Sequence, residues 1–186
     1  MKRMIAVSIA LMLSGCGEQP AGKPEAAAAP EPWPMEWTYQ EGSCQHTETR
    51  VLIANAANLI TWADPEACEI AAGSWQSWGR DVQLPLHLIW VVPLVTPPHA
   101  EMHGAADWSR EQKLAFINDK DNLIVVDRVS ASERGDLNPE AWTPLPRYWC
   151  EYAQRWQRVK QRYQLDSGEE EQKALARMLE SCPAAE

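Results

Sequence analysis

The segment LHLIWVVPL, residues 86–94, decides the fold that the sequence predicts, together with GAADW at residues 104–108 and FINDKDNL at residues 116–123. An apolar run of this kind predicts a strand over residues 84–94 that is buried on both faces. Residues 68–75 predict a shorter strand that pairs with it as a hairpin. The rest of the domain is expected to pack around this apolar centre.

Helical patterns flank the apolar centre. Trp149 and Tyr152 begin a run of apolar residues at steps of three and four, which predicts an amphipathic helix. Ser109 and Gln112 fit a capping box, so a helix is expected to begin at Ser109. Helices are predicted at residues 45–60, 100–104, 109–118 and 149–163, and a further helix is predicted from a second capping-box pattern at Ser167 onwards. Residues 122–127 form a strand-like apolar run, and residues 129–142 form a polar segment with a turn.

The composition indicates one domain with a substantial core. The chain has 186 residues, 45% of them hydrophobic, with ten Trp and one Phe. This length suits one domain plus a tail. An interior rich in Trp must also supply hydrogen-bond acceptors for the indole N–H groups.

The N-terminus resembles the signal of a bacterial lipoprotein. A basic start precedes an apolar run, residues 4–13, that is too short to span a bilayer as a helix. The sequence LSGC at residues 13–16 is similar to a lipobox, which implies cleavage after residue 15 and acylation of Cys16. Gly17 is typical of lipoproteins that reach the outer membrane of Gram-negative cells. We therefore expect an envelope protein that is held in the outer membrane by its lipid and faces the periplasm; a plain secretory signal is the alternative.

Three segments follow from this pattern. Residues 1–15 are expected to be the signal peptide, residues 16–35 a lipidated, disordered tether rich in Pro and Ala, and residues 36–186 the folded domain. Trp33 and Trp37, near the end of the tether, are expected to pack on the domain.

The net charge weighs against strong nucleic-acid binding. Residues 1–15 hold Lys2 and Arg3 and no acidic residue, so 17 basic residues become 15 against 26 acidic ones, a net charge of −11. Such a surface repels phosphate backbones unless basic residues cluster locally. One helix has such a group, but three glutamates follow it, and a solvated face is expected there. These residues are Arg155, Arg158, Lys160 and Arg162, opposed by Glu169, Glu170 and Glu171.

The cysteines predict disulfides. Assigning Cys16 to the lipid leaves four of the five cysteines, and an even number in an exported chain indicates two bridges. We expect Cys44 to pair with Cys68 and Cys150 with Cys182, because each pair brackets a local helical unit. A zinc site is the alternative, although no Cys-x-x-Cys pair supports it.

Short motifs from Cys44 to Cys182 resemble those of exported HNH endonuclease-like proteins related to the C-terminal domain of the GmrSD restriction enzyme. The resemblance rests on order and spacing rather than on any one motif, and it covers nearly the whole predicted domain. The matching residues are Cys44, Thr47, Arg50, Val51 and Leu52; Cys68, Gly73 and Trp75; Val92, Pro93 and Leu94; Gly104, Ala105 and Trp108; Phe116, Asn118, Asp119, Asn122 and Leu123; Gly135, Asp136, Pro139, Trp142 and Pro144; and Cys150, Glu151, Tyr152, Trp156, Val159, Lys160 and Leu165.

The resemblance implies a catalytic site that is altered in this chain. In that family an Asp-His pair ends the strand and an Asn follows later. The His is a general base for water, and the Asp and Asn hold a divalent metal. Ile89 and Trp90 stand at the Asp and His positions, Ala131 at the Asn position and Arg134 at that of a following Lys. Ile and Ala offer no metal ligand and indole is no base near neutral pH, so we expect loss of nuclease activity and no cofactor.

Three histidines are candidates to compensate for the lost base. His87 lies two residues before Ile89 and is expected on the same strand face. His99 and His103 lie in the connection that follows the strand. For each of them, an exposed or hydrogen-bonded structural histidine is the simpler interpretation.

Asn118, Asp119 and Asn122 are candidate ligands for a divalent metal. Such a metal would be needed only if the nuclease were active. The simpler interpretation is a helix end and turn whose side chains satisfy backbone groups.

The sequence thus predicts an α+β domain: a small ββα-metal (HNH-like) core wrapped by helices and held by two disulfides. The expected function is that of an envelope-anchored pseudonuclease that acts by binding, in a partner-masking, immunity or exclusion role. A basic protein is the expected partner, with weak or no nucleic-acid binding. Two alternatives stay open: an active metal-dependent DNA endonuclease with a rearranged site, and a structural envelope lipoprotein.

Overall fold

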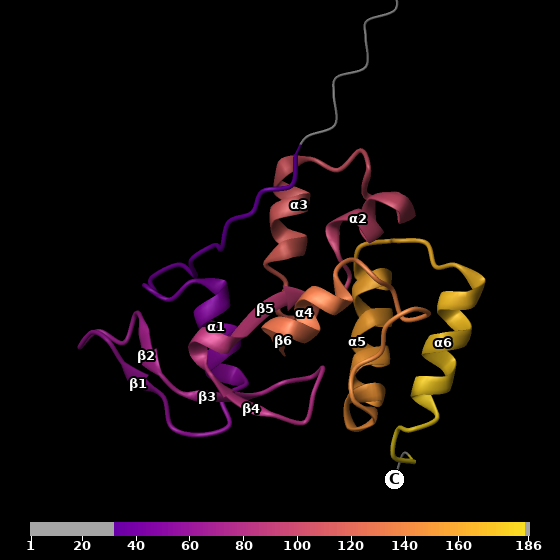
Figure 1. The fold of residues 1–186 in the computed structure, drawn as a ribbon. Coiled ribbons are helices and arrows are strands. Elements are labelled where there is room, and N and C mark those ends of the chain that lie inside the picture. The colour runs from indigo at the N-terminus through magenta and orange to yellow at the C-terminus, as the bar shows by residue number, and fades with distance from the viewer. Residues whose placement is uncertain (1–31, 185–186) are drawn as a thin grey trace, which may run out of the picture.

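The computed structural model describes residues 32–184, which form a mixed α+β domain (Figure 1). Within this range, the chain has six α-helices and three short antiparallel strand pairs, and two disulfides link distant parts of the chain. The predicted signal peptide, Cys16 and most of the tether lie outside the described residues. No helix within residues 32–184 has the length and apolar character needed to cross a membrane.

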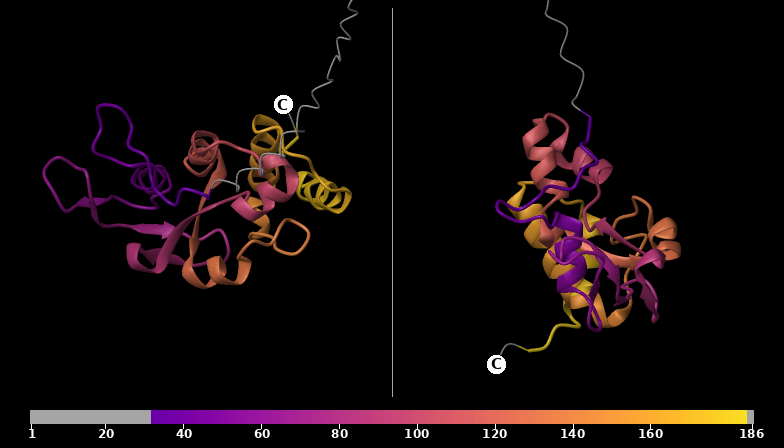
Figure 2. Two further views of the ribbon diagram at one scale, coloured as in Figure 1. Left: turned by 90° about the horizontal axis from the view of Figure 1, so that it is seen from above. Right: turned by 90° about the vertical axis from the view of Figure 1, so that its left-hand side faces the viewer.

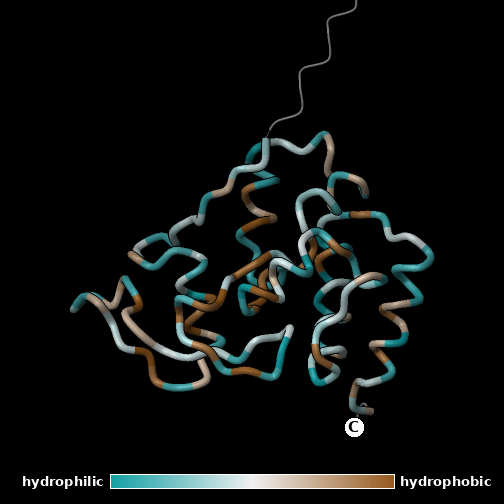
Figure 3. Tube along the Cα trace, in the orientation of Figure 1, coloured by the Kyte–Doolittle hydropathy of each residue, from teal (hydrophilic) through white to brown (hydrophobic). Residues whose placement is uncertain are grey.

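The central strand pair consists of β5 (Ile89–Pro93) and β6 (Leu123–Asp127), with Val91 opposite Val125. Every residue of β6 is buried, and apolar segments gather at this centre in Figure 3. Helix α1 (Thr47–Ala54) contacts both strands, as does α4 (Arg128–Arg134). The residues of β5 and β6 accordingly divide between two apolar clusters, so the pair is the shared wall of a two-part core.

The strand predicted over residues 84–94 is broken in two. It contains β4 (Gln83–Pro85), a 3-10 helix (Leu86–Leu88) and then β5. Pro85 ends β4 because proline has no N–H to donate to a further ladder bond. The predicted hairpin is formed by β3 (Ser74–Gln76) with β4, whereas β5 pairs with β6 instead.

The expectation that this strand is buried on both faces is also wrong, because the side chain of Trp90 in β5 is exposed. It is β6 that is covered on both sides. The third strand pair, β1 (Thr61–Trp62) with β2 (Ile70–Ala72), lies at the opposite end of the domain from helix α6 in the view from above (Figure 2, left).

Five helices follow the predictions closely or in part. Helix α3 (Arg110–Ile117) begins with the predicted capping box between Ser109 and Gln112. Helix α5 (Trp149–Arg162) matches the aromatic pattern. Helix α1 ends earlier than predicted, at Ala54, because the amide of Ala57 pairs with the carbonyl of Ser74 at 2.8 Å.

Helix α6 (Glu169–Leu179) is present, but the capping box predicted at Ser167 is wrong. The N-cap residue is Gly168, which has no side chain to cap the helix. The predicted short helix near residues 100–104 is part of a longer one: α2 (Pro97–Ala100) runs on into a helical turn (Glu101–Ala105).

Helix α4 was not predicted, because residues 129–142 are polar. Asp127 begins it by accepting hydrogen bonds from the amides of Val129 and Ser130. Gly135 ends it with a φ of +46°, a left-handed conformation that glycine adopts without a steric penalty. Since α4 follows β6 directly, the chain forms a strand–strand–helix unit from β5, β6 and α4.

The tryptophans contribute to the core as predicted, with acceptors for their N–H groups. Trp75 is fully buried, and its Nε1 donates to the carbonyl of Leu52 at 2.7 Å. Trp33 packs on the domain, with its ring centroid 5.6 Å from that of Phe116, and donates to Glu101 at 2.7 Å. The last residues before position 36 are therefore attached to the domain.

Both predicted disulfides are confirmed. Cys44 pairs with Cys68, with a Cα–Cα distance of 5.2 Å, and Cys150 pairs with Cys182, with a Cα–Cα distance of 4.8 Å. The first bridge links the segment before α1 to the segment before β2, and the second links the start of α5 to the end of α6. Closing loops of these sizes stabilises the fold by about 3–4 kcal/mol each.

Candidate functional site

The strand–strand–helix unit holds the positions that the resemblance assigns to catalysis. Ile89 is 5% exposed and belongs to the apolar cluster that includes residues of α1. Trp90, the next residue along the strand, points to the opposite face and is 43% exposed. The guanidinium of Arg128, at the start of α4, lies 5.0 Å from the centre of the Trp90 ring. Ala131 is half-buried one turn further along α4 and packs against the other cluster.

None of these side chains offers a general base or a metal ligand. The carboxylate of Asp127, at the end of β6 opposite Ile89, already binds other groups of the protein. Its Oδ2 accepts from Ser77 at 2.8 Å, its Oδ1 lies 3.1 Å from Arg80, and it caps α4. Burial would raise the pKa of Asp127, but the bonds from Ser130 and Ser77 and the charge of Arg80 outweigh it and lower the pKa. Asp127 therefore acts as a structural anion.

His87 is not placed as predicted. It lies in the 3-10 helix before β5 rather than on the strand, and its side chain is exposed. The alternation of strand side chains that would align it with Ile89 does not apply there.

The candidate ligands Asn118, Asp119 and Asn122 are engaged in scaffold bonds. Asn118 ends α3, accepts from the amide of Thr38 at 2.8 Å and donates to the carbonyl of Glu36 at 3.1 Å. Asp119 caps the turn and pairs with Arg162 at 2.5 Å. Asn122 is fully buried and accepts from the amide of Val95 at 2.8 Å. The structure thus gives all three the roles of the simpler interpretation.

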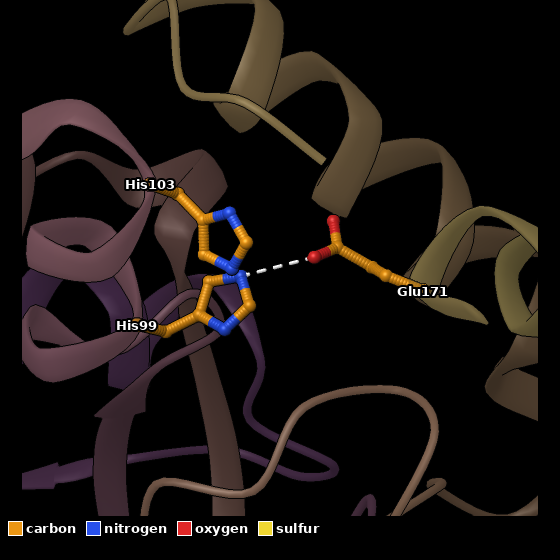
Figure 4. Close-up of side chains that lie close together, drawn as sticks. All are labelled: His99, His103 and Glu171. Carbon is orange, nitrogen blue, oxygen red and sulfur yellow. Dashed lines mark ion pairs between the residues drawn. The ribbon is translucent and has the colours of Figure 1, made fainter. Parts of the chain in front are cut away.

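The structure does bring His99 and His103 together, and it places Glu171 beside them (Figure 4). Lys160 completes the cluster, and sequence reasoning missed both Glu171 and Lys160 as members of it. The imidazole rings of His99 and His103 lie 4.2 Å apart, and Nε2 of His99 is 3.1 Å from Oε2 of Glu171. The ammonium of Lys160 lies 2.9 Å from the same nitrogen and 3.4 Å from the same oxygen. Glu171 is 1% exposed, and Lys160 and His99 are also buried.

Local structure explains how this cluster forms. His99 lies on α2, and His103 lies four residues later in the helical turn that continues it, so the two side chains share one face. The chain kinks at His103 and Gly104, where Gly104 has a φ of +123°. Lys160 comes from α5 and Glu171 from α6, whose ends are joined by the Cys150–Cys182 bridge.

The electrostatics of the cluster are those of a buried ion pair. Burial would raise the pKa of Glu171, but hydrogen bonds from His99 and Trp156 and the charge of Lys160 outweigh it and lower the pKa to about 2. Burial lowers the pKa of Lys160, and Glu171 offsets part of this. The pKa of His103 is lowered by burial and by the neighbouring charge of Lys160. Glu171 therefore stays ionised at neutral pH and pairs with Lys160.

These groups also form the one set of potential metal ligands within residues 32–184. One ligand atom from each of His99, His103 and Glu171 lies within 4.8 Å of the others. However, the Lys160 ammonium approaches two of these atoms at hydrogen-bond distance. The cluster thus carries its own cation, and a metal would have to displace Lys160.

The lowered pKa of Glu171 predicts how the stability of the fold depends on pH. Because the folded-state pKa of Glu171 is below its ordinary value of 4.5, its contribution to stability is present above pH 4.5 and is lost as the pH falls towards about 2. The expected loss is on the order of 2–3 kcal/mol. Urea unfolding between pH 7 and pH 2.5 measures it.

The variant Glu171→Gln is the control for this prediction. It should be less stable at neutral pH, and its stability should change less between pH 4.5 and pH 2.5 than that of the unchanged protein. Equal pH dependence in the two proteins would contradict the assignment to Glu171.

The solvated basic face expected on α5 is wrong in part, because Arg155 and Lys160 are buried. Of the three glutamates expected to oppose it, Glu169 and Glu170 pair with Lys173 instead. Arg162 pairs with Asp119 and with Asp121 at 2.7 Å. Arg155 is buried and donates to the backbone carbonyls of Asp121 and Lys120 at 3.0 and 2.9 Å. These side chains hold α5 against the turn before β6.

Comparison with known proteins finds one informative relative. No protein-family model matches the chain, and no solved structure matches it. A protein of the fungus Arthroderma benhamiae, described as an uncharacterized secreted protein, is 34% identical over 183 residues, which cover 92% of this chain and 83% of that protein. The chain therefore belongs to the same family as this secreted protein.

Proposed function

We propose that the chain is an exported, lipid-anchored pseudonuclease: an HNH endonuclease-like domain that has lost its reaction and acts by binding. The observation that carries the proposal is the strand–strand–helix unit of β5, β6 and α4. By the resemblance, Trp90 and Ala131 of this unit stand at the positions of the general base and a metal ligand. The order β5, β6, α4 supports the small ββα core that the resemblance implies. An HNH-like fold whose catalytic positions carry other residues suits a protein that binds a partner and catalyses no reaction.

The setting of the protein is part of the proposal. The relative from Arthroderma benhamiae is described as secreted, which supports export of this chain. The lipobox at residues 13–16 supports lipidation of Cys16 and attachment to the outer membrane on its periplasmic side. Several acyl chains on one residue give a stable anchor.

The exposed face of the unit suits a protein partner. Trp90 is exposed, Arg128 stacks on its ring, and the neighbouring Val129 is 50% exposed. Trp and Arg are the side chains most often found at the centre of protein interfaces. With a net charge of −11 after removal of residues 1–15, the protein favours a basic partner over a nucleic acid.

Cross-linking from position 90 tests this proposal. A photoreactive residue replaces Trp90 in the full chain, and a second variant carries it at Leu59, an exposed control position between α1 and β1. A basic protein cross-linked at position 90 and not at position 59, and lost when the salt concentration is raised, is the expected result. If no protein is cross-linked at position 90, the binding role is wrong and the structural lipoprotein alternative is favoured.

A cleavage assay completes the test. The purified protein is expected to leave plasmid DNA intact with Mg²⁺, Mn²⁺ or Zn²⁺. Restoring all three positions, with Ile89→Asp, Trp90→His and Ala131→Asn, is expected to produce metal-dependent nicking. The single change Leu88→His, at a nearby exposed position, should not. Cleavage by the unchanged protein that is lost in His99→Ala or His103→Ala would instead establish the endonuclease alternative.

A further inference from the structure

The free edge of strand β5, the edge that faces away from β6, has no role in the proposed function. β5 and β6 form a two-stranded sheet. A cavity of about 590 Å³ is lined by the consecutive residues Val91, Val92 and Pro93. Successive side chains of a strand point to opposite faces, so a cavity that meets all three residues lies along the edge of the strand. Among the described residues that line this cavity, none belongs to β6, so the cavity lies at the free edge.

The hydrogen bonds of the strand pair show which backbone groups of β5 point to this edge. The amide of Leu94 donates to the carbonyl of Asn122, the residue opposite it, at 2.6 Å. Along an antiparallel pair, residues that bond across the pair alternate with residues whose N–H and C=O point outward. Val92 therefore bonds across to β6, and the N–H and C=O of Val91 point to the free edge.

Two observations agree with this alternation. The carbonyl of Val125, the residue opposite Val91, points away from β5 and accepts from the amide of Trp78 at 3.2 Å. Pro93 lies two residues after Val91, at an outward position, and it has no N–H that a ladder bond to β6 would need.

The outward backbone groups of Val91 have no partner. Within residues 32–184, neither its N–H nor its C=O makes a hydrogen bond. The outward groups on either side are partly used, since the amide of Ile89 donates to the carbonyl of Leu86 and the carbonyl of Pro93 accepts from Arg134 at 2.8 Å. An unpaired strand edge is a template for a further extended chain, which can bond the N–H and the C=O of one residue together.

The carboxylates beside this edge favour a basic ligand. Asp136 lines the first cavity. A second cavity, of about 300 Å³, shares Val91 with the first and extends to Ile89, and its lining includes Glu48 and Glu69. Within residues 32–184, none of these three carboxylates makes an ion pair. Lys or Arg side chains of a ligand would therefore meet a carboxylate at either cavity.

The other charged side chains on these walls already bind groups of the protein. Glu36 pairs with Arg110 at 2.7 Å. Arg134 is 2% exposed and donates to the carbonyls of Pro93 and Leu94. The walls thus offer apolar surface and unpaired negative charge, which suit a ligand with an apolar centre and basic ends.

We propose that the free edge of β5 binds an extended segment of a partner protein as an added strand, and that this segment has apolar residues at its centre and Lys or Arg at its ends. The added strand bonds the backbone of Val91, its apolar side chains fill the two cavities, and its basic side chains meet the carboxylates. This inference names the partner segment for the binding role proposed above and rests on that role for the existence of a partner.

Calorimetric titration of the full chain with a model peptide tests the proposal. The probe is Lys-Val-Thr-Val-Thr-Val-Lys with both termini blocked, and the matched peptide has Glu in place of each Lys. The first peptide should bind, and the second should bind about tenfold more weakly or not at all. No binding of the first peptide, or equal binding of the two, would show that the proposal is wrong. A dimer of the full chain that the peptide does not dissociate would also overturn it, because a second copy would then cover the edge.

Peptides with methylated amides test the strand pairing itself. Successive N–H groups of an extended peptide point to opposite sides, so methylation of one alternate set removes the donors that face β5 and methylation of the other set spares them. One set should abolish binding, and the other should change the affinity by less than about twofold. The same effect from both sets would exclude an added strand.

Amide hydrogen exchange locates the added strand on the protein. In the free protein, the amide of Val91 should exchange faster than that of Val92, which bonds to β6. Saturation with the peptide should slow exchange at Val91 by about tenfold or more and leave Val92 little changed. An unchanged rate at Val91 with peptide bound would overturn the assignment to this edge.

A change of charge completes the design. Asp136→Asn should weaken binding of the Lys peptide by about two- to fivefold, as expected for an exposed ion pair. Glu140→Gln, at an exposed position that lines neither cavity, is the matched control and should have no effect. Equal affinities in the two variants would contradict the role of Asp136.

The edge and the Trp90 face can fail separately. A basic protein cross-linked at position 90, combined with no binding of the peptide, would refute the added strand alone. Peptide binding that protects Val91, combined with no protein cross-linked at position 90, would refute the role of Trp90 and support the edge.

Discussion

Replacing Lys160 with methionine is expected to lower the free energy of unfolding by about 3–5 kcal/mol, because it leaves the Glu171 carboxylate buried without its cation. Glu171 is 1% exposed, so water does not compensate for the loss. Its remaining partners are Trp156, which donates at 2.9 Å, and His99 at 3.1 Å. Chemical denaturation at pH 7 measures the change in stability.

Two further variants separate the ion pair from a general effect of losing a lysine. Lys173 on the same helix as Glu171 is 55% exposed and pairs with Glu169 and Glu170. Lys173→Met should therefore cost less than about 1 kcal/mol. Combining Lys160→Met with Glu171→Leu should restore much of the stability, since a buried pair replaced by apolar groups is often neutral. If Lys160→Met costs no more than Lys173→Met, the cluster does not have the proposed electrostatic role.

Removing the Cys150–Cys182 bridge is the second large change. Replacing both cysteines with serine should lower the free energy of unfolding by about 3–4 kcal/mol, because the bridge closes a loop with a sequence separation of 32. Helix α6 packs mainly against α5. Without the bridge it should open locally, and trypsin should cut at Arg177 well before the rest of the domain unfolds.

The other disulfide is the matched control. Replacing Cys44 and Cys68 should cost a similar free energy, since their separation is 24, but should not expose Arg177. Loss of that bridge should instead loosen the segment between α1 and β2. Equal protection of Arg177 in the Cys150 and Cys68 variants would show that α6 does not depend on its bridge.

Periodicity and capping signals predicted those parts of the fold that depend on neighbouring residues. The aromatic spacing from Trp149 onwards gave α5, and Ser109 with Gln112 gave the start of α3. The prediction failed where long-range contacts determine the strand boundaries and the strand pairing. Residues 86–94 are apolar throughout, but the sequence does not show that a 3-10 helix interrupts them or that β6 rather than β3 pairs with β5. Helix α4 is polar and has an Asp cap rather than a capping box, so its signal was overlooked.

The same distinction holds for the candidate site. His99 and His103 are close in sequence, and their proximity follows from helical spacing. Lys160 is 61 residues from His99, and it looked like one member of a solvated basic face. Only the packing of α5 and α6 against α2 shows that it and Glu171 are buried.

Because Trp33 packs on the domain, the N-terminal segment joins the domain at a fixed end. Residues 33 and 36 are held to the α3 end of the molecule by the bonds to Glu101 and Arg110, and helix α6 ends at the opposite end of the domain (Figure 1). A tether attached through the N-terminus would therefore hold the domain at its α3 end. The end of α6 would then point away from the attachment point. A domain attached in this way presents the end of α6 to its surroundings. Moving the attachment to the other terminus would reverse the orientation of the domain.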